Sequence, residues 1–118
     1  MTVKDFYEAN KDILLAPVSS EEFQQLSDGM VVFCVSNGGG NKPAEERIVR
    51  AVGYRMVVAM ERNTSGEIVT VGTVGLTANG YAKVEWISAD DIAEETKLVY
   101  RCKPLQAGDK RANNLWEF

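Results

Sequence analysis

Residues 54–77 read YRMVVAMERNTSGEIVTVGTVGLT, and this stretch decides the fold. Over residues 54–61 every second side chain is expected to point to the same side, as in a β-strand. One side would carry Tyr54, Met56, Val58 and Met60, and the other Arg55, Val57, Ala59 and Glu61. Residues 63–66, Asn-Thr-Ser-Gly, are typical of a hairpin turn, so residues 68–77 are predicted to return as a second, antiparallel strand.

The chain on both sides extends this hairpin into a sheet. Asn79-Gly80 predicts another tight turn, and residues 81–86 alternate again, which completes a three-stranded meander. Residues 30–35, Met-Val-Val-Phe-Cys-Val, form an apolar run typical of a central strand buried on both faces. Residues 97–103 alternate and predict a last strand, closed by Pro104. We therefore expect an antiparallel sheet of about five strands.

The helices are predicted from capping boxes, in which a Ser or Thr and an acidic residue three positions later satisfy each other's backbone N–H groups. Such pairs are Thr2 with Asp5, Ser19 with Glu22, and Ser88 with Asp91. The first helix is expected to continue to Pro17, because apolar residues from Val3 to Leu14 fall near one face. Residues 43–52 fit either a helix that ends at Gly53 or the start of a long strand, and we favour the helix.

Length and composition indicate one globular domain. The 118 residues suit a single α+β domain, residues 1–118, in which N-terminal helices pack on the antiparallel sheet. Charged residues interrupt the first twelve positions, and no stretch approaches the roughly 20 apolar residues that cross a bilayer, so we expect a cytoplasmic protein without a membrane partner. The two cysteines, Cys34 and Cys102, are expected to be free, buried thiols.

The sequence holds no histidine, which removes the commonest general base and the usual zinc ligand. Carboxylate pairs are the remaining candidates for acid–base chemistry, and they are Glu45 with Glu46, Asp90 with Asp91, and Glu94 with Glu95. Each pair lies near a predicted helix end, and the helix dipole alone accounts for acidic residues at a helix N-terminus. We therefore expect no catalytic residues, no metal and no cofactor, and a carboxylate-based enzyme is the least favoured hypothesis.

Charge is distributed in bands along the chain. Residues 1–29 and 63–96 are acidic, with two basic against six acidic groups and one against six, whereas residues 30–62 and 97–118 are basic, with five against three and five against two. The favoured interpretation is that the bands are solvated faces of adjacent elements. The alternative is an acidic and a basic face that steer association with a partner. We expect no nucleic-acid partner, because the net charge is −4 and because Tyr54, Trp86 and Tyr100 are predicted to point inward, away from the basic residues beside them.

The sharpest local feature is the glycine-rich loop SNGGGNKP, residues 36–43. If a helix follows it, its backbone N–H groups could hold an anion, with nearby arginines adding positive charge. The loop lacks the spacing of a P-loop and of the dinucleotide fingerprint, so a mobile loop is the favoured interpretation. Such a loop can still become ordered when a partner binds. The predicted ligand- or partner-binding residues are Asn37, Gly38, Gly39, Gly40, Asn41, Lys42, Arg47 and Arg50.

The last residues complete the functional prediction. Leu115, Trp116 and Phe118 are expected either to fold back on the sheet or to act as oligomer contacts, since such side chains bury a large apolar area. Banded charge, loop and tail favour a non-catalytic protein-interaction module whose partner is another protein or a second copy. Size and acidity suit a small accessory protein of phages or mobile elements, acting as a homo-oligomeric structural or assembly component or as an inhibitor of a larger protein. The alternative is a small-molecule or anion binding protein, for phosphate or a nucleotide, that uses loop 36–43.

Overall fold

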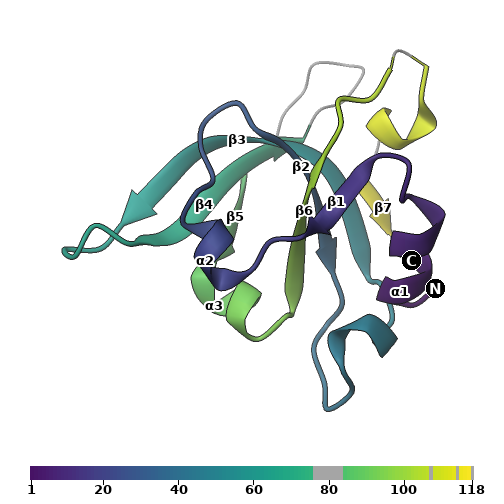
Figure 1. Ribbon diagram of the computed structural model, residues 1–118, viewed down its shortest axis with the longest axis horizontal. Coiled ribbons are helices and arrows are strands. Elements are labelled where there is room, and N and C mark those ends of the chain that lie inside the picture. The colour runs from purple at the N-terminus through teal and green to yellow at the C-terminus, as the bar shows by residue number, and fades with distance from the viewer. Residues whose placement is uncertain (76–83, 107, 114, 118) are drawn as a thin grey trace.

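The computed structural model describes residues 1–75, 84–106, 108–113 and 115–117, and of residues 112–117 it describes the backbone alone. Short helices surround a strongly twisted sheet (Figure 1). The helices are α1 Val3–Ala9, α2 Ser20–Phe23 and α3 Ala89–Ala93, with the 3₁₀ helices η1 Ala44–Glu46 and η2 Lys110–Asn113. The strands are β1 Leu14–Pro17, β2 Val31–Ser36, β3 Ala51–Arg62, β4 Ile68–Gly75, β5 Val84–Ser88, β6 Lys97–Cys102 and β7 Leu115–Glu117. The predicted α+β fold class and the three capping boxes are confirmed.

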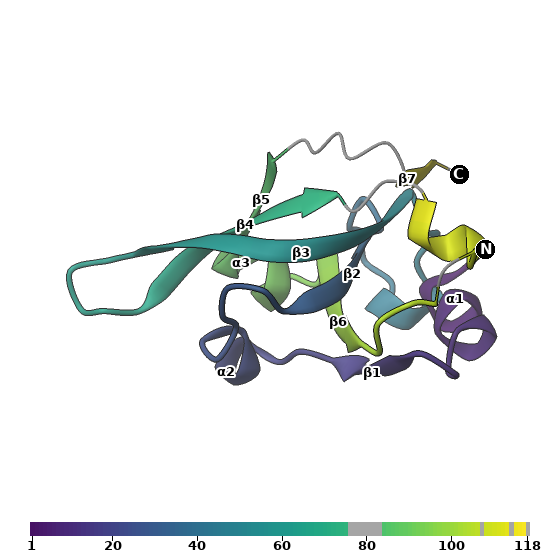
Figure 2. The same cartoon turned by 90° about the horizontal axis from the view of Figure 1, so that it is seen from above.

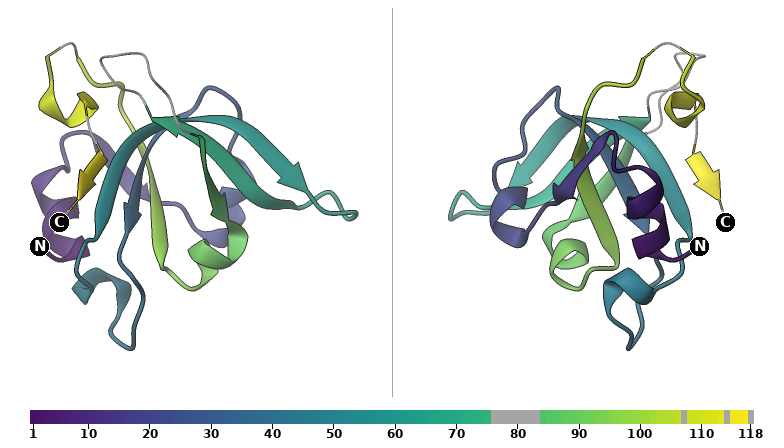
Figure 3. Two further views of the ribbon diagram at one scale, coloured as in Figure 1. Left: turned by 180° about the vertical axis from the view of Figure 1, so that it is seen from behind. Right: turned by 45° about the vertical axis from the view of Figure 1, so that its right-hand side comes forward.

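Within the described residues seven strands form one antiparallel sheet in the order β1-β6-β2-β3-β4-β5, with β7 paired to β3. One edge of β3 pairs with β2 over residues 51–56, and the other pairs with β4 over residues 55–62 and with β7 over residues 51–53. Figure 3 shows β7 beside the start of β3. The predicted meander β3–β4–β5 is confirmed, although its Asn79-Gly80 turn lies outside the described residues. The sheet is larger than predicted because β1 and β7 add strands.

The predicted helix over residues 2–17 is wrong beyond Ala9. Asn10 ends α1: its Nδ2 donates to the Phe6 carbonyl oxygen (2.8 Å), and its own carbonyl oxygen accepts from the amides of Ile13 and Leu14 (3.1 and 3.0 Å). The chain then runs as β1 and pairs with β6. Ile13 and Leu14 are buried, as their spacing suggested, but a turn and a strand bury them.

The helix favoured for residues 43–52 is also wrong. Residues 44–46 form the short turn η1, after which the backbone is extended. The amide of Val49 donates to the carbonyl oxygen of Met1 (2.9 Å), and the amide of Arg50 donates to that of Ser36 (2.7 Å). Gly53 lies inside β3, where a Cβ atom would lie 3.3 Å from side-chain carbons of Arg55. The glycine is therefore needed for close packing and does not end a helix.

Two hydrophobic cores lie on opposite faces of the sheet, because successive strand residues point to opposite sides. Along β2, Phe33 points into the first core with α1, and Val32 points into the second with α2 and α3. The first core contains Val3, Phe6, Ile13, Leu14, Phe33, Val35, Val49, Val52, Tyr54, Leu98 and Tyr100. The second contains Val18, Phe23, Leu26, Val32, Val57, Ile68, Val71, Ile87, Ile92 and Val99. Figure 2 shows α1 at one end of the molecule, the β3–β4 hairpin at the other, and α2 and α3 between them. The prediction of a central strand buried on both faces is confirmed.

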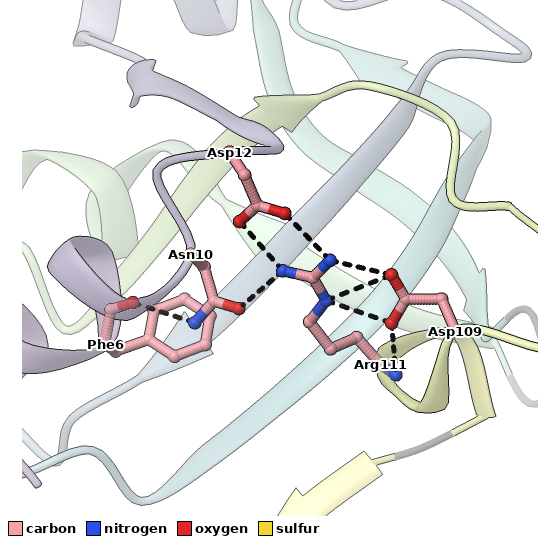
Figure 4. A network of polar contacts seen from close by, with 5 residues as sticks. All are labelled: Phe6, Asn10, Asp12, Asp109 and Arg111. Carbon is pink, nitrogen blue, oxygen red and sulfur yellow. Dashed lines mark hydrogen bonds and ion pairs between the residues drawn. The ribbon is translucent and has the colours of Figure 1, made fainter.

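An arginine clamp attaches the C-terminal segment to the turn after α1 (Figure 4). Arg111 makes a bidentate pair with Asp12, with both N–O distances 3.0 Å, and its Nη2 lies 2.7 Å from Oδ2 of Asp109. Hydrogen bonds from Arg111 lower the pKa of Asp12 and the pKa of Asp109 below their usual values. The same segment reaches the first core, where the amide of Leu105 donates to the hydroxyl of Tyr54 (3.2 Å). This Arg111 clamp therefore links the two ends of the chain over the first core.

Candidate interaction surfaces

The glycine-rich loop after β2 has a defined shape. Asn37 is buried, its Nδ2 donates to the carbonyl oxygen of Glu95 (2.6 Å), and its Oδ1 accepts from the amide of Gly39 (2.8 Å). Gly38, Gly39 and Gly40 all have positive φ, between 75° and 125°, a conformation that favours glycine. The three glycines therefore allow the backbone to adopt the left-handed conformations that this loop requires.

Arg47 fixes the same loop from the other side. Its Nε donates to the carbonyl oxygen of Lys42 (2.9 Å) and its Nη2 to that of Gly40 (3.2 Å). Its Nη1 donates to the carbonyl oxygens of Glu95 (3.0 Å) and Glu94 (3.3 Å), at the end of α3. We call Asn37 and Arg47 the loop brace, because together they tie the loop to the turn between α3 and β6.

The eight predicted binding residues therefore take different roles. Asn37, Gly39, Gly40 and Arg47 belong to the brace contacts, and Arg50 lies beside Gly38, whose added Cβ atom would be 3.5 Å from Nε of Arg50. Asn41 and Lys42 are exposed at the tip of the loop. The guanidinium of Arg47 faces backbone carbonyl groups of its own chain, and anion binding by the loop stays a prediction.

Glu95, so far considered only as one of a carboxylate pair, has a backbone conformation that the sequence pattern does not indicate. Among the described residues it is the one non-glycine residue with positive φ (58°). It follows the C-cap of α3, where glycine or asparagine usually takes the left-handed conformation. Its carbonyl oxygen accepts from both members of the loop brace, Asn37 and Arg47. These contacts offset a conformation that costs about 1–2 kcal/mol in a residue with a side chain.

A groove of about 480 Å³ opens between α1, η1 and the ends of β1 and β6. Its floor is apolar and aromatic, and the rings of Tyr7 and Tyr100 stack there with centroids 5.8 Å apart. Burial raises the pKa of Tyr100 to about 12, so its hydroxyl is neutral at physiological pH. The groove, which we call the α1 groove, is lined by Val3, Lys4, Tyr7, Glu8, Pro17, Pro43, Ala44, Glu45, Glu95, Leu98 and Tyr100.

A second surface lies on the outer part of the sheet. Cross-strand register places Met56, Val74 and Val84 in one row, and Ala59, Gly72 and Trp86 in the next, all on one face. Val84 is 47% exposed and Trp86 45% exposed, so the prediction that Trp86 points inward is wrong. A Cβ atom added to Gly72 would lie 3.1–3.3 Å from the Trp86 ring, which shows that the indole lies flat on this glycine. We call these six residues the Trp86 face.

Arg55 supports the Trp86 face from the other side of β3. The alternation places its side chain in solvent, but Arg55 is 2% exposed. Its Nε donates to Oγ1 of Thr73 (2.6 Å) and its Nη2 to the carbonyl oxygen of Thr73 (3.0 Å), and its Nη1 lies 3.8 Å from a carboxylate oxygen of Glu85. The guanidinium therefore joins β3 to β4 beneath the exposed surface. The inward positions of Tyr54 and Tyr100 are confirmed.

The remaining predicted features add little chemistry. Both cysteines are free as predicted, but each is half-buried and not fully buried. Burial raises the pKa of Cys34 to about 12 and that of Cys102 to about 11, so neither forms a thiolate at neutral pH. The described residues contain no group of three or more His, Cys, Asp or Glu side chains placed to hold a metal ion. In the same part of the chain no helix has the length and apolar character needed to cross a membrane.

Leu115 and Trp116 lie in β7, whose backbone pairs with β3, and Phe118 lies outside the described residues.

Comparison with protein-family models, curated proteins and solved structures finds no match to the chain. The surfaces of the molecule are therefore the basis for a functional proposal. Two of them are apolar and open to solvent, the α1 groove and the Trp86 face. They differ in charge, because the groove has carboxylates at its rim and the Trp86 face is formed by uncharged residues.

Proposed function

We propose that this protein is a non-catalytic protein-interaction module that binds a protein partner through the Trp86 face. The observation that carries the proposal is the exposed indole of Trp86, seated on Gly72 beside the exposed Val84. Tryptophan is enriched among the residues that dominate binding energy at protein interfaces, and apolar patches on soluble proteins often mark such interfaces.

The geometry suits a protein surface better than a small molecule. The Trp86 face is a sheet surface built by β3, β4 and β5, and small ligands favour concave sites. The ring of Trp86 is already held against Gly72, so little conformational entropy is lost when a partner covers it. Partners of this kind include a larger protein that is inhibited and a second copy in an assembly, as for a cytosolic accessory protein of a phage or mobile element.

The experiment compares wild type with Trp86→Ala and with a matched control, Leu15→Ala. Leu15 is 48% exposed and lies on β1, at the opposite edge of the sheet from β5. The three proteins are used for affinity capture from the native host with quantitative mass spectrometry, and their oligomeric state is measured by light scattering. We expect one partner, or self-association, to be retained by Leu15→Ala and reduced more than tenfold by Trp86→Ala, since such anchor residues contribute about 2 kcal/mol or more. Equal capture by all three proteins, with all three monomeric, would contradict the proposal.

The anion-binding alternative rests on the exposed Lys42 and Arg50 near the loop tip. Its test is thermal unfolding with phosphate and a set of nucleotides. A ligand present at about 100 times its dissociation constant stabilises the folded state by about 2.7 kcal/mol. A shift that Lys42→Ala removes would support this alternative, and the absence of any shift across the set would contradict it.

A further inference from the structure

The α1 groove is apolar at its base and acidic at its rim. The carboxylates of Glu8, Glu45 and Glu95 line it against the single ammonium group of Lys4. Glu8 is paired with Lys11 at 2.9 Å, whereas the other two carboxylates make no ion pair within the described part of the chain. The nearby guanidinium of Arg47 faces backbone carbonyl groups of the loop and of the α3–β6 turn. The rim therefore carries excess negative charge directed at whatever enters the groove.

A second notable feature of the groove is the backbone conformation of Glu95. Its left-handed backbone would be easier for glycine, so the folded state holds a carboxylate at the groove at a cost in stability. The loop brace fixes this turn through the Glu95 carbonyl oxygen, which leaves the side chain exposed. A charged residue that opposes local stability and lines an open groove is typical of a binding function.

We infer that the α1 groove binds an extended segment of a protein partner that presents a lysine or arginine side chain next to an apolar one. A volume of about 480 Å³ takes a few side chains. The apolar side chain would lie on Leu98 and the stacked tyrosines, and the cation would lie between Glu45 and Glu95. An anionic segment is excluded by the same charges. This site is distinct from the Trp86 face and does not depend on it.

The experiment is a titration of the ¹⁵N-labelled full chain, followed by NMR, with the capped peptide Leu-Arg-Leu-Arg-Leu and the matched peptide Leu-Glu-Leu-Glu-Leu. We expect the arginine peptide to shift the amides of α1, η1 and Leu98, and the glutamate peptide to leave them unchanged. Added salt should weaken the binding, because the rim charges are exposed. Equal shifts with both peptides, or none in this region up to millimolar peptide, would overturn the proposal.

Substitutions then test which carboxylates at the rim bind the arginine side chain of the peptide. Glu45→Gln and Glu95→Gln should each weaken the arginine peptide about threefold, as for an exposed ion pair. The controls are Glu46→Gln and Glu94→Gln, adjacent carboxylates that do not line the groove, and they should bind as wild type does. If all four variants bind equally, the rim does not recognise the cation and the proposal fails. Trp86→Ala should leave peptide binding unchanged, so failure here and failure of the Trp86 face are distinguishable.

Glu95→Gly separates binding from structure. Glycine relieves the left-handed backbone, so we expect the Tm to rise by about 4–8 °C while the affinity for the arginine peptide falls. A structural role alone would give the opposite pair of results, lower stability with unchanged affinity, and would overturn the proposal. If this variant does not fold, the Glu95→Gln titration still decides the outcome.

Discussion

The side of the sheet that faces α1 has two halves, both of which carry apolar side chains. One half is buried under other segments of the chain, and the other is exposed to solvent. On β2 and β6, Phe33, Val35, Leu98 and Tyr100 lie under α1 and the C-terminal segment, and none is more than 8% exposed. On β5 the same face continues with Val84 and Trp86, which are 47% and 45% exposed. Apolar residues in the covered half therefore hold the fold together, whereas those in the exposed half are available for recognition.

The largest effect should come from the covered half. Phe33→Ala removes a ring that contacts Phe6 and Tyr54 (centroids 6.2 and 5.2 Å away) at the centre of the first core. We expect the free energy of unfolding to fall by about 3–5 kcal/mol, because the transfer energy is lost and a cavity remains. Urea denaturation measures the change. A loss below about 1 kcal/mol would show that the covered half does not hold the fold together more strongly than the exposed half does.

The next effect should come from the support beneath the exposed half. Arg55→Met keeps most of the buried stem but removes the hydrogen bonds to Thr73, so we expect a loss of about 1–3 kcal/mol. The matched control is Arg62→Met, an exposed arginine on the same strand that donates to the carbonyl oxygen of Gly66 (2.8 Å), and its change should stay within about 0.5 kcal/mol. Equal changes in the two variants would show that burial of Arg55 adds nothing.

A smaller, pH-dependent effect is expected at the Arg111 clamp over the covered half. Hydrogen bonds from Arg111 lower the pKa of Asp12 and the pKa of Asp109 in the folded state. The stability they contribute is fully present above about pH 4, near the pKa of an unfolded aspartate, and is lost as pH falls through the lower folded values.

The measurement is urea unfolding of wild type and Arg111→Met from pH 7 to pH 2. The stability difference should be constant at neutral pH and should shrink below about pH 4, while Lys110→Met, an adjacent exposed cation, shows no such change. A difference that is independent of pH would mean that Arg111 acts through packing alone.

The smallest effect on stability should come from the exposed half itself. Trp86→Ala should change the free energy of unfolding by less than about 1 kcal/mol, because nearly half of the side chain is already in water. Thermal and urea unfolding measure this on the same samples that are used for the binding assay. A large loss of stability would mean that the indole belongs to the core and would remove the argument for recognition.

The strands could be predicted from the sequence, but it could not be predicted which parts of each sheet face are buried by other segments. Period-two alternation identifies residues that share a face, and it places β3, β4 and β6 correctly. It also places Trp86 inside and Arg55 outside, and both are wrong. The reason is that burial depends on segments distant in sequence: α1 reaches only part of the sheet, and Thr73 meets Arg55 across a strand pair. A register shift between Val57 and Ala59 further breaks the simple alternation.

The candidate sites were less accessible to sequence reasoning than the fold. The glycine run identifies the loop, but the roles of Asn37 and Arg47 depend on Glu95, which lies about 50 residues further along the chain. A glutamate after a short acidic helix gives no local signal of a left-handed backbone, since that position usually shows glycine or asparagine. The α1 groove is assembled from four separate stretches of chain, and no single motif contains it.

The pairing of β1 with β6 has a consequence for synthesis of the chain. Leu14 lies opposite Cys102, so α1 and β1 leave the ribosome long before their partner strand exists. The β3–β4 hairpin closes over the five residues 63–67 and can form first, because short loops cost the least entropy to close. A nascent chain therefore carries Ile13 and Leu14 without their partner strand until β6 has been translated. This N-terminal stretch is where we expect a ribosome-associated chaperone to bind.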